Sequence, residues 1–360
     1  MQTCDNDFRE KHVFVCGLQR SGTSVLARNL GKLDDCTSFK QTGVLEDEGQ
    51  YLQDGFLTDH RYGGVGWYGF DPRAHLTEHS ELLTQDNIAR LKASWDSHWD
   101  PTKPIRLEKT PGNLIMTRFL QAAFPDAYFI VIKRHPVPAS MASQKWSMSP
   151  LHRLFEHWLQ CYDIFESDKR HLNRVYELTY EGYIQDASRY HREIADFIGT
   201  RPPAVEMEQV TAAHNEKYFN RWSELLTSSR FSSYYRFIAT RYEPGFSRHG
   251  YSLLNSSDGS YTREAVATPL MEPRAANGFL GWSCCTGANF MFFVLRFHKK
   301  YMHSMTRGLR ACLSDSAKQR IKNVLQTGRL HWLARFIAPR WFYEELRDKS
   351  LWNQSRLKMR

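Results

Sequence analysis

Apolar residues follow two kinds of pattern along the first two-thirds of the chain. Short continuous apolar runs predict buried strands at residues 13–16 and 128–132, and residues 175–180 are expected to form another strand. Elsewhere, apolar residues return at helical spacing, which predicts one helix just after Gly22, a long amphipathic helix around 154–162 and another at 190–198. Gly199 follows the last of these and is typical of a residue that ends a helix.

The alternation of strands and helices predicts an α/β fold, P-loop-like, with three α/β/α layers around a central parallel sheet. Residues 255–260 have the composition of a linker. Beyond them, apolar residues at helical spacing predict an amphipathic helix through Leu309, Leu313, Ala317, Ile321 and Leu325. We therefore expect a main domain at residues 1–254 and a basic, helical C-terminal extension at residues 255–360.

The net charge of +9 is unevenly distributed. Residues 290–360 contain 16 Lys and Arg against four acidic residues, so this tail carries +12 and the rest of the chain carries −3. Charge alone is compatible with membrane phosphates, an anionic polymer or nucleic acid. We expect an anionic membrane surface as the partner of the tail, and no specific nucleic acid.

The seven cysteines are scattered and form no CxxC pair, which is evidence against a zinc ribbon or a redox motif. The N-terminus lacks the basic and apolar segments of a secretory signal. The longest candidate for a membrane-spanning helix, residues 290–297, contains Arg296 and is shorter than the ~20 residues that such a helix needs. These features predict a cytoplasmic protein, peripheral at most to a membrane. No HExxH motif occurs, and no metal is expected.

The turn between the first strand and the first helix has the spacing of a phosphate-binding loop. Gly17 and Gly22 enclose four residues, and the hydroxyl residues Thr23 and Ser24 follow. A strand, a glycine turn and a helix present backbone amides to a phosphate. A nucleoside triphosphate loop has Lys after the second glycine, whereas this chain has Thr23 there and Arg20 inside the loop. This favours a donor with one 5′-phosphate bonded to sulfate, and it argues against a kinase or nucleotidase.

A second anchor follows the run at 128–132. Lys133 and Arg134 stand at the carboxyl end of this predicted strand, where open α/β sheets bind ligands. Pro136 is suited to the start of the next helix. Ser140 and Ser143 follow, and an arginine with a hydroxyl suits a ribose 3′-phosphate.

With these two anchors in order, the chain resembles the family of sulfotransferases that use 3′-phosphoadenosine-5′-phosphosulfate (PAPS). The similarity continues through residues 106–111, 177–181 and 215–218, and it covers residues 10–254. The resemblance implies that PAPS is bound by Gly17, Gln19, Arg20, Ser21, Gly22, Thr23, Ser24, Arg134, Ser143, Lys217 and Tyr218. The family's phosphate-binding serine stands eight residues after the arginine. That position is Ala142 here, so Ser143 is preferred and Ser140 remains an alternative.

The resemblance also implies catalytic groups. Sulfuryl transfer to a hydroxyl needs a base for the proton and a cation for the bridging oxygen. We expect Arg20 and Lys109 as cations and Glu48 as the base, with Glu46 as the alternative base. His135 stands beside the 3′-phosphate anchor, so we expect a packing or hydrogen-bonding role for it.

The predicted function is therefore transfer of a sulfuryl group from PAPS to a hydroxyl of a carbohydrate, lipid or other metabolite. Residues 63–68 form a glycine-rich aromatic loop that either contacts the acceptor or is an ordinary surface loop. Trp146 either stacks on adenine or packs in the core. The alternatives are a P-loop kinase or nucleotidase, and a non-catalytic nucleotide-binding protein that docks on a membrane through its tail.

Overall fold

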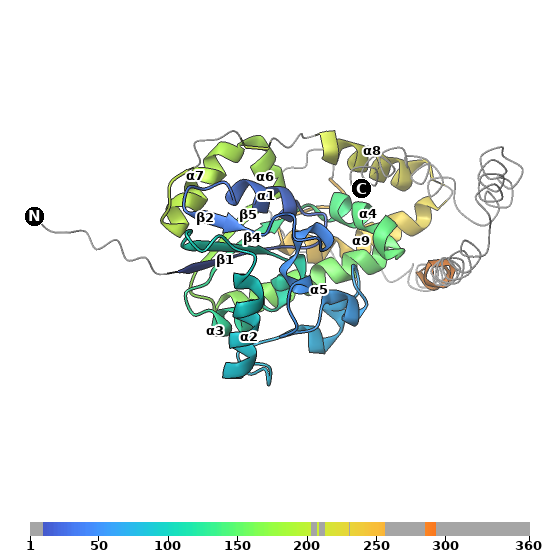
Figure 1. Ribbon diagram of the computed structural model, residues 1–360. Coiled ribbons are helices and arrows are strands. Elements are labelled where there is room, and N and C mark those ends of the chain that lie inside the picture. Colours follow the sequence, from blue (N-terminus) through green and yellow to red (C-terminus); the bar gives the residue numbers. More distant parts are fainter. Residues whose placement is uncertain (1–9, 203–206, 209–212, 230, 256–284, 293–360) are drawn as a thin grey trace, which may run out of the picture. The chain divides into compact units, whose positions relative to one another are not determined.

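The structure, a computed structural model, describes residues 10–202, 207–208, 213–229, 231–255 and 285–292 (Figure 1). The strands are β1 (Lys11–Cys16), β2 (Cys36–Ser38), β3 (Ile105–Lys109), β4 (Tyr128–Lys133) and β5 (Val175–Thr179). The longer helices are α1 (Thr23–Leu30), α2 (Gln85–Asp96), α3 (Thr117–Ala123), α4 (Pro136–Ser147), α5 (Leu151–Lys169), α6 (Tyr180–Gln185), α7 (Ala187–Ile198), α8 (Ala213–Thr227) and α9 (Ser232–Arg248).

All five strands pair in parallel, in the order β2-β3-β1-β4-β5. The central strand β1 places Val15 opposite both Lys109 of β3 and Ile130 of β4. Because parallel strands end at the same edge, the loops that follow β1, β3 and β4 meet there. This edge is where open α/β sheets bind ligands.

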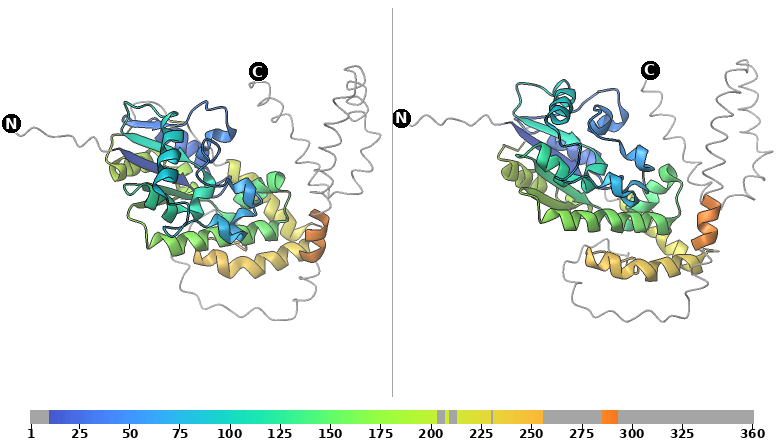
Figure 2. Two further views of the ribbon diagram at one scale, coloured as in Figure 1. Left: turned by 60° about the horizontal axis from the view of Figure 1, so that its bottom comes forward. Right: turned by 90° about the horizontal axis from the view of Figure 1, so that it is seen from below.

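Helices cover both faces of the sheet (Figure 2), and a separate cluster of buried apolar side chains lies on each face. On one face, Leu26 of α1 and Ile194 of α7 pack on Val13 and Val15. On the other face, Trp95 of α2, Phe119 of α3 and Phe155 of α5 belong to one cluster with Phe14 and Phe129. Residues that alternate along β1 therefore point into opposite clusters, as a strand buried on both faces requires.

The predicted three-layer α/β/α fold is confirmed. The strands expected at 13–16, 128–132 and 175–180 are β1, β4 and β5, and the helices expected around 154–162 and 190–198 are α5 and α7. Gly199 ends α7 in a left-handed conformation (φ 77°), as expected. Strands β2 and β3 were not predicted.

After β5 and α7, the chain adds helices beside the sheet. Helix α8 packs on α4 and α9 packs on α5. Residues 285–292 are helical and contact this part, since His152 Nε2 donates to Asn289 Oδ1 at 3.0 Å. The helix predicted through Leu309 and Leu325 lies outside the described residues, and the boundary at 254/255 stays a prediction. Among the described residues, no helix has the length and apolarity to cross a membrane.

Candidate functional site

The predicted phosphate loop connects β1 to α1 through a tight turn. Gly17 has φ +151°, and a Cβ there would lie 2.4 Å from the carbonyl oxygen of Ile132. Gly22 has φ +96°, and a Cβ there would lie 2.6 Å from the Tyr180 ring. Both glycines are therefore needed for the close approach of the loop to β4 and α6. Arg20 also has a positive φ, 69°, and its side chain is exposed.

Helix α1 begins directly after Gly22, so its first amides face the loop. Thr23 is buried, and Ser24 donates from Oγ to Glu46 Oε2 at 3.3 Å. Ser21 is buried and Gln19 is half-buried. The predicted loop residues thus form one continuous turn at the edge where the strands end.

Arg134 follows β4 and lies under this loop. It is buried, and its Nη1 donates to the carbonyl oxygen of Arg20 at 2.6 Å. Its Nε and Nη2 both donate to Asn215 Oδ1, at 3.0 and 2.5 Å. Its Cζ lies 4.3 Å from the centre of the Tyr180 ring. Among the described residues, no carboxylate forms an ion pair with Arg134, so its hydrogen-bond partners are neutral. The Glu181 carboxylate, which accepts from Asn215, interacts with it only at longer range.

Helix α8 supplies the group that fixes Arg134. Asn215 lies in its first turn and donates from Nδ2 to Glu181 Oε1 at 3.2 Å, while accepting from Arg134. Lys217 and Tyr218 follow it, with Lys217 exposed and its Nζ 5.0 Å from the centre of the Tyr218 ring. The structure therefore brings the predicted segment 215–218 beside the predicted phosphate-binding arginine. Asn215 itself was not predicted as a site residue.

His135 is held in a fixed, neutral state. Its Nδ1 accepts from the Val137 amide at 3.2 Å, and its Nε2 donates to the Ser252 carbonyl at 3.1 Å. Burial lowers the pKa of His135 to about 3. These contacts agree with the hydrogen-bonding role expected from the sequence.

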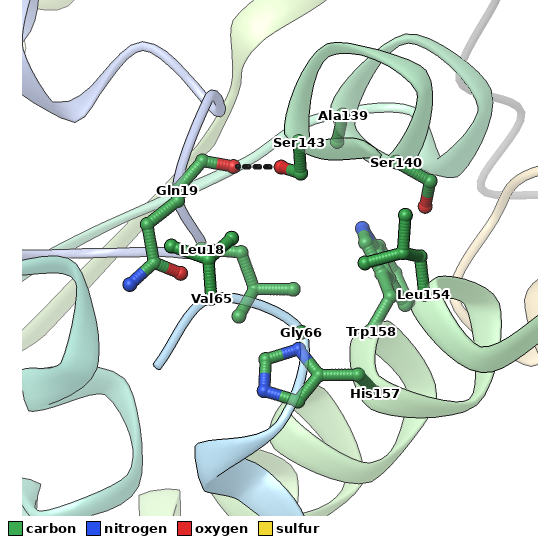
Figure 3. A pocket seen from close by; sticks show the side chains of 10 residues that line it. All are labelled: Leu18, Gln19, Val65, Gly66, Ala139, Ser140, Ser143, Leu154, His157 and Trp158. Atoms are coloured by element: carbon green, nitrogen blue, oxygen red, sulfur yellow. Dashed lines mark hydrogen bonds between the residues drawn. The ribbon is translucent and has the colours of Figure 1, made fainter. Parts of the chain in front are cut away.

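Both candidate serines of α4 face a small pocket (Figure 3). Ser143 donates from Oγ to the Gln19 carbonyl at 3.4 Å, which ties α4 to the loop. The residues that line the pocket are Leu18, Gln19, Val65, Gly66, Ala139, Ser140, Ser143, Leu154, His157 and Trp158. Arg134 is not among them, so neither serine is seen to share a contact with the arginine. The choice between Ser143 and Ser140 stays a prediction.

The glycine-rich segment 63–68 forms one wall of this pocket. Gly66 packs so closely that a Cβ would lie 2.6 Å from Leu154 Cδ2. Trp67 Nε1 donates to Ser149 Oγ at 2.9 Å, and the Gly69 amide donates to His157 Nε2 at 3.2 Å. Burial lowers the pKa of His157 to about 3, so its remaining hydrogen is on Nδ1. The pocket is mainly apolar with a few uncharged polar groups.

Glu48 and Lys109 form a buried pair at the end of β3. Lys109 Nζ lies 3.3 Å from Glu48 Oε1 and donates to the Glu46 carbonyl at 2.9 Å. Gln50 Nε2 donates to Glu48 Oε2 at 2.7 Å. Burial raises the pKa of Glu48, while Lys109 opposes this shift. The structure therefore brings the expected base and the expected cation together, and it leaves Glu46 exposed.

Glu108 lies fully inside the molecule and holds the segment that carries Glu48. Its Oε1 accepts from the Gly49 amide at 2.9 Å and from Thr110 Oγ1 at 2.6 Å, and its Oε2 accepts from Asn113. Burial raises the pKa of Glu108 to about 7. Its donors are all internal, so its role is to position the neighbouring groups.

Asp59 and His60, which no sequence motif indicated, also border the loop. Asp59 is buried and accepts from Gln19 Nε2 at 2.9 Å. Its backbone amide donates to Gln50 Oε1 at 2.9 Å, and its Oδ1 lies 2.8 Å from His60 Nδ1. No regular spacing relates them to the motifs, so only the folded chain reveals them. In the described part of the chain, no group of three or more His, Cys, Asp or Glu side chains has the arrangement of a metal site.

Comparison with known proteins identifies the family of this chain. A model described as the sulfotransferase family matches residues 12–203. Comparison with curated proteins finds no match. Solved structures with similarity include the sulfotransferase domain of the Synechococcus PCC 7002 olefin synthase, which is 17% identical, with 76% of this chain and 93% of that chain covered and a TM-score of 0.36.

Two further solved structures are similar at the same level. Sulfotransferase STF9 from Mycobacterium avium is 14% identical, with 67% of this chain and 76% of that chain covered and a TM-score of 0.43. Retinol dehydratase, in a complex with retinol and PAP, is 16% identical, with 59% and 66% covered and a TM-score of 0.29. The family rests on the match at residues 12–203.

Proposed function

Because this chain belongs to the sulfotransferase family, we propose that it moves a sulfuryl group from PAPS to a hydroxyl of an acceptor. The products are adenosine 3′,5′-bisphosphate and a sulfate ester. We further propose that the donor needs no metal ion, since a cation of the protein stands in the loop where a nucleotidase would use Lys and Mg²⁺.

The observation that carries this proposal is the environment of Arg134. A buried guanidinium is costly unless a counter-charge compensates it, and the hydrogen-bond partners of this one are neutral. The carboxylate of Glu181 acts on it only at longer range, across Asn215. A phosphate that reached it would gain charge-assisted hydrogen bonds. Its contact with the Arg20 carbonyl puts it beside the loop that would hold a 5′-phosphate. The loop and Arg134 thus offer two neighbouring positions that can each bind a phosphate, as a 3′,5′-bisphosphate requires.

In the proposed reaction, the acceptor oxygen attacks sulfur while the bond from sulfur to the phosphate oxygen breaks. The electron pair of that bond goes to the phosphate, where Arg20 offsets the charge. Lys109 lies beside the proposed base and offsets charge on the sulfuryl oxygens. Its salt bridge to Glu48 fixes both side chains before the substrate binds.

Glu48 is the proposed proton acceptor. A carboxylate whose pKa is raised by burial is a stronger base than an exposed one, and it is ionised above that pKa. Gln50 and Lys109 hold its two oxygens in place. The proton of the acceptor hydroxyl goes to this carboxylate as the new bond from oxygen to sulfur forms.

The pocket beside Gln19 is the proposed place for part of the acceptor. The described side chains that line it are apolar or uncharged, which suits an uncharged part of an acceptor. Trp146, on the same helix as the pocket serines, is 47% exposed and does not pack in the core. We therefore keep it as a candidate for stacking on adenine.

A turnover assay tests the proposal against the kinase alternative. The protein is incubated with PAPS in EDTA, with 4-nitrophenol and glucosamine as acceptors, and adenosine 3′,5′-bisphosphate is quantified by chromatography. We expect bisphosphate release that Arg20→Ala reduces at least a hundredfold. Release of phosphate from ATP that requires Mg²⁺ and survives Arg20→Ala would instead support a kinase or nucleotidase.

A further inference from the structure

Asp59 and His60 form a pair that the proposed reaction has not yet used. The pair opens a short 3₁₀ helix, Asp59–Tyr62. His60 Nδ1 lies 2.8 Å from Asp59 Oδ1 and 2.9 Å from Tyr51 Oη. Because the carboxylate can only accept, the hydrogen is on Nδ1. The side chain of His60 is 59% exposed whereas that of Asp59 is 6% exposed, so the ring is fixed at one nitrogen and open at the other side.

Hydrogen bonds place this pair between the phosphate loop and Glu48. Asp59 Oδ2 accepts from Gln19 Nε2 at 2.9 Å, one residue before Arg20. The Asp59 amide donates to Gln50 Oε1 at 2.9 Å, and Gln50 in turn donates to Glu48. The pair is therefore linked on one side to the loop and on the other to the proposed base.

The charges at this edge need a second cation. Glu48 and Asp59 are both buried carboxylates, and Lys109 pairs with Glu48. Asp59 lies 2.8 Å from Nδ1 of His60, which compensates the Asp59 charge only when the ring is protonated. A sulfuryl group carries negative charge on its oxygens, so an uncompensated Asp59 carboxylate beside it would repel it. Protonated His60 removes this repulsion and adds a hydrogen-bond donor.

We propose that His60, protonated and held by Asp59, binds the oxygens of the transferred sulfuryl group through Nε2–H. The inference rests on the proposed sulfuryl transfer, and it adds a group that no sequence motif indicated. Asp59 is then a positioning residue that acts through His60. The bond-making step and the proton path to Glu48 are unchanged.

The pH dependence follows from the groups that face His60. Asp59 raises the pKa of His60, with a further contribution from Glu48, while burial opposes them. Burial also raises the pKa of Tyr51, so its hydroxyl stays neutral. Sulfate is therefore bound best below the pKa of His60, and its binding weakens as the pH rises through that value.

The test uses inorganic sulfate as the probe for the sulfuryl oxygens. Sulfate is titrated by calorimetry into the full chain saturated with adenosine 3′,5′-bisphosphate, at several pH values from 6 to 9. We expect the sulfate affinity of the wild-type protein to fall at least fivefold over this range. In His60→Ala, we expect the sulfate affinity at pH 6 to be as low as that of the wild-type protein at pH 9. The sulfate affinity of this variant should vary less than twofold over the pH range. In Asp59→Asn, the decrease in sulfate affinity should occur at lower pH than in the wild-type protein, because the carboxylate that raises the pKa of His60 is absent.

Two controls separate this idea from loss of folding and from failure of the proposed function. His79→Ala removes an exposed histidine, 82% exposed in its side chain, and should leave sulfate binding unchanged. Bisphosphate affinity should stay within twofold in His60→Ala and His79→Ala. Asp59→Asn is left out of this control, because Asp59 accepts from Gln19 of the phosphate loop. Sulfate binding in His60→Ala that keeps the wild-type pH dependence would overturn the inference. Absence of bisphosphate binding in the wild-type protein would instead contradict the proposed function, and the inference with it.

Discussion

Arg20 and Arg134 show how two residues of one type take different tasks around a single loop. Arg20 is exposed and has a left-handed backbone, so its side chain is free to reach a ligand in front of the loop. Arg134 is buried behind it and held at three nitrogens by Asn215 and the Arg20 carbonyl. The sequence identified both arginines by their place after a strand, but the partner Asn215 is 81 residues away from Arg134.

The fixed geometry of Arg134 gives a prediction for Arg134→Lys. Lysine keeps the charge, but it cannot donate to Asn215 and to the Arg20 carbonyl with the same planar group. We expect the affinity for adenosine 3′,5′-bisphosphate to fall at least tenfold, measured by calorimetry. Arg73→Lys, at a side chain that is 77% exposed, is the matched control and should leave the affinity unchanged. Equal affinities for wild type and Arg134→Lys would contradict a phosphate contact by the guanidinium.

Glu48 and Glu46 offer a matched pair of substitutions, since they stand two residues apart in one segment. Glu48→Gln removes the proposed base and keeps its shape, so we expect the transfer rate to fall by roughly 10²–10⁴. Glu46→Gln, at an exposed position, should change the rate less than threefold. The wild-type rate should also fall on acidification through the raised pKa of Glu48, because a protonated base cannot accept the acceptor proton. A larger loss in Glu46→Gln would reverse the assignment.

Strand β3 shows at the scale of one element why part of the fold could not be predicted. Its sequence, Ile105 to Lys109, alternates apolar and charged residues, so no continuous run marks it. Glu108 and Lys109 are buried at its carboxyl end, where their partners include the distant Gly49 amide and Glu46 carbonyl as well as the nearby Thr110 hydroxyl. β1 and β4 were predictable, since burial on both faces makes them almost continuously apolar. β5 is an edge strand in which only Leu178 is buried, and it was predicted without such a run.

Glu108 makes this element sensitive to pH. Its folded-state pKa is about 7, above the value of 4.5 for a free side chain, so the folded protein binds the proton more tightly. Its contribution to stability is thus full below about pH 4.5 and is lost as the pH rises through about 7, by about 3 kcal/mol. Denaturant unfolding of wild type and Glu108→Gln should diverge across this window, because the variant cannot titrate there. The exposed Glu81→Gln should follow the wild type, and parallel curves for Glu108→Gln would refute the assignment.

At the scale of the whole molecule, the sequence separates an α/β core from a basic tail. The core was predictable in class because alternating strands and helices admit few arrangements. The composite edge, where residues 19, 48, 59, 109 and 134 gather, was predictable only in part. The loops that follow β1 and β4 could be predicted as binding loops from their sequence motifs. The segment with Asp59 and His60 has no regular spacing from those motifs, so it could not be predicted as part of the site.

The tail gives a prediction for the intact chain. Residues 293–360 hold all 16 basic residues counted in the tail, and we expect them to bind anionic vesicles. The full chain should co-sediment with vesicles that contain phosphatidylserine and be released by 0.5 M salt, roughly the range in which screening is strong. A chain that ends at Phe292 should stay in the supernatant while keeping bisphosphate binding. Equal sedimentation of both chains would exclude the tail as the membrane contact.

The central claim is that the loop after β1 and Arg134 together hold a 3′,5′-bisphosphate. Calorimetric titration of adenosine 3′,5′-bisphosphate into the full chain in EDTA tests it most directly, with ATP and adenosine 5′-monophosphate in parallel. We predict one site, bound without metal and at least tenfold more tightly than either of the other nucleotides, since neither carries a 3′-phosphate for Arg134. Absence of binding, or tighter binding of ATP that requires Mg²⁺, would contradict the account.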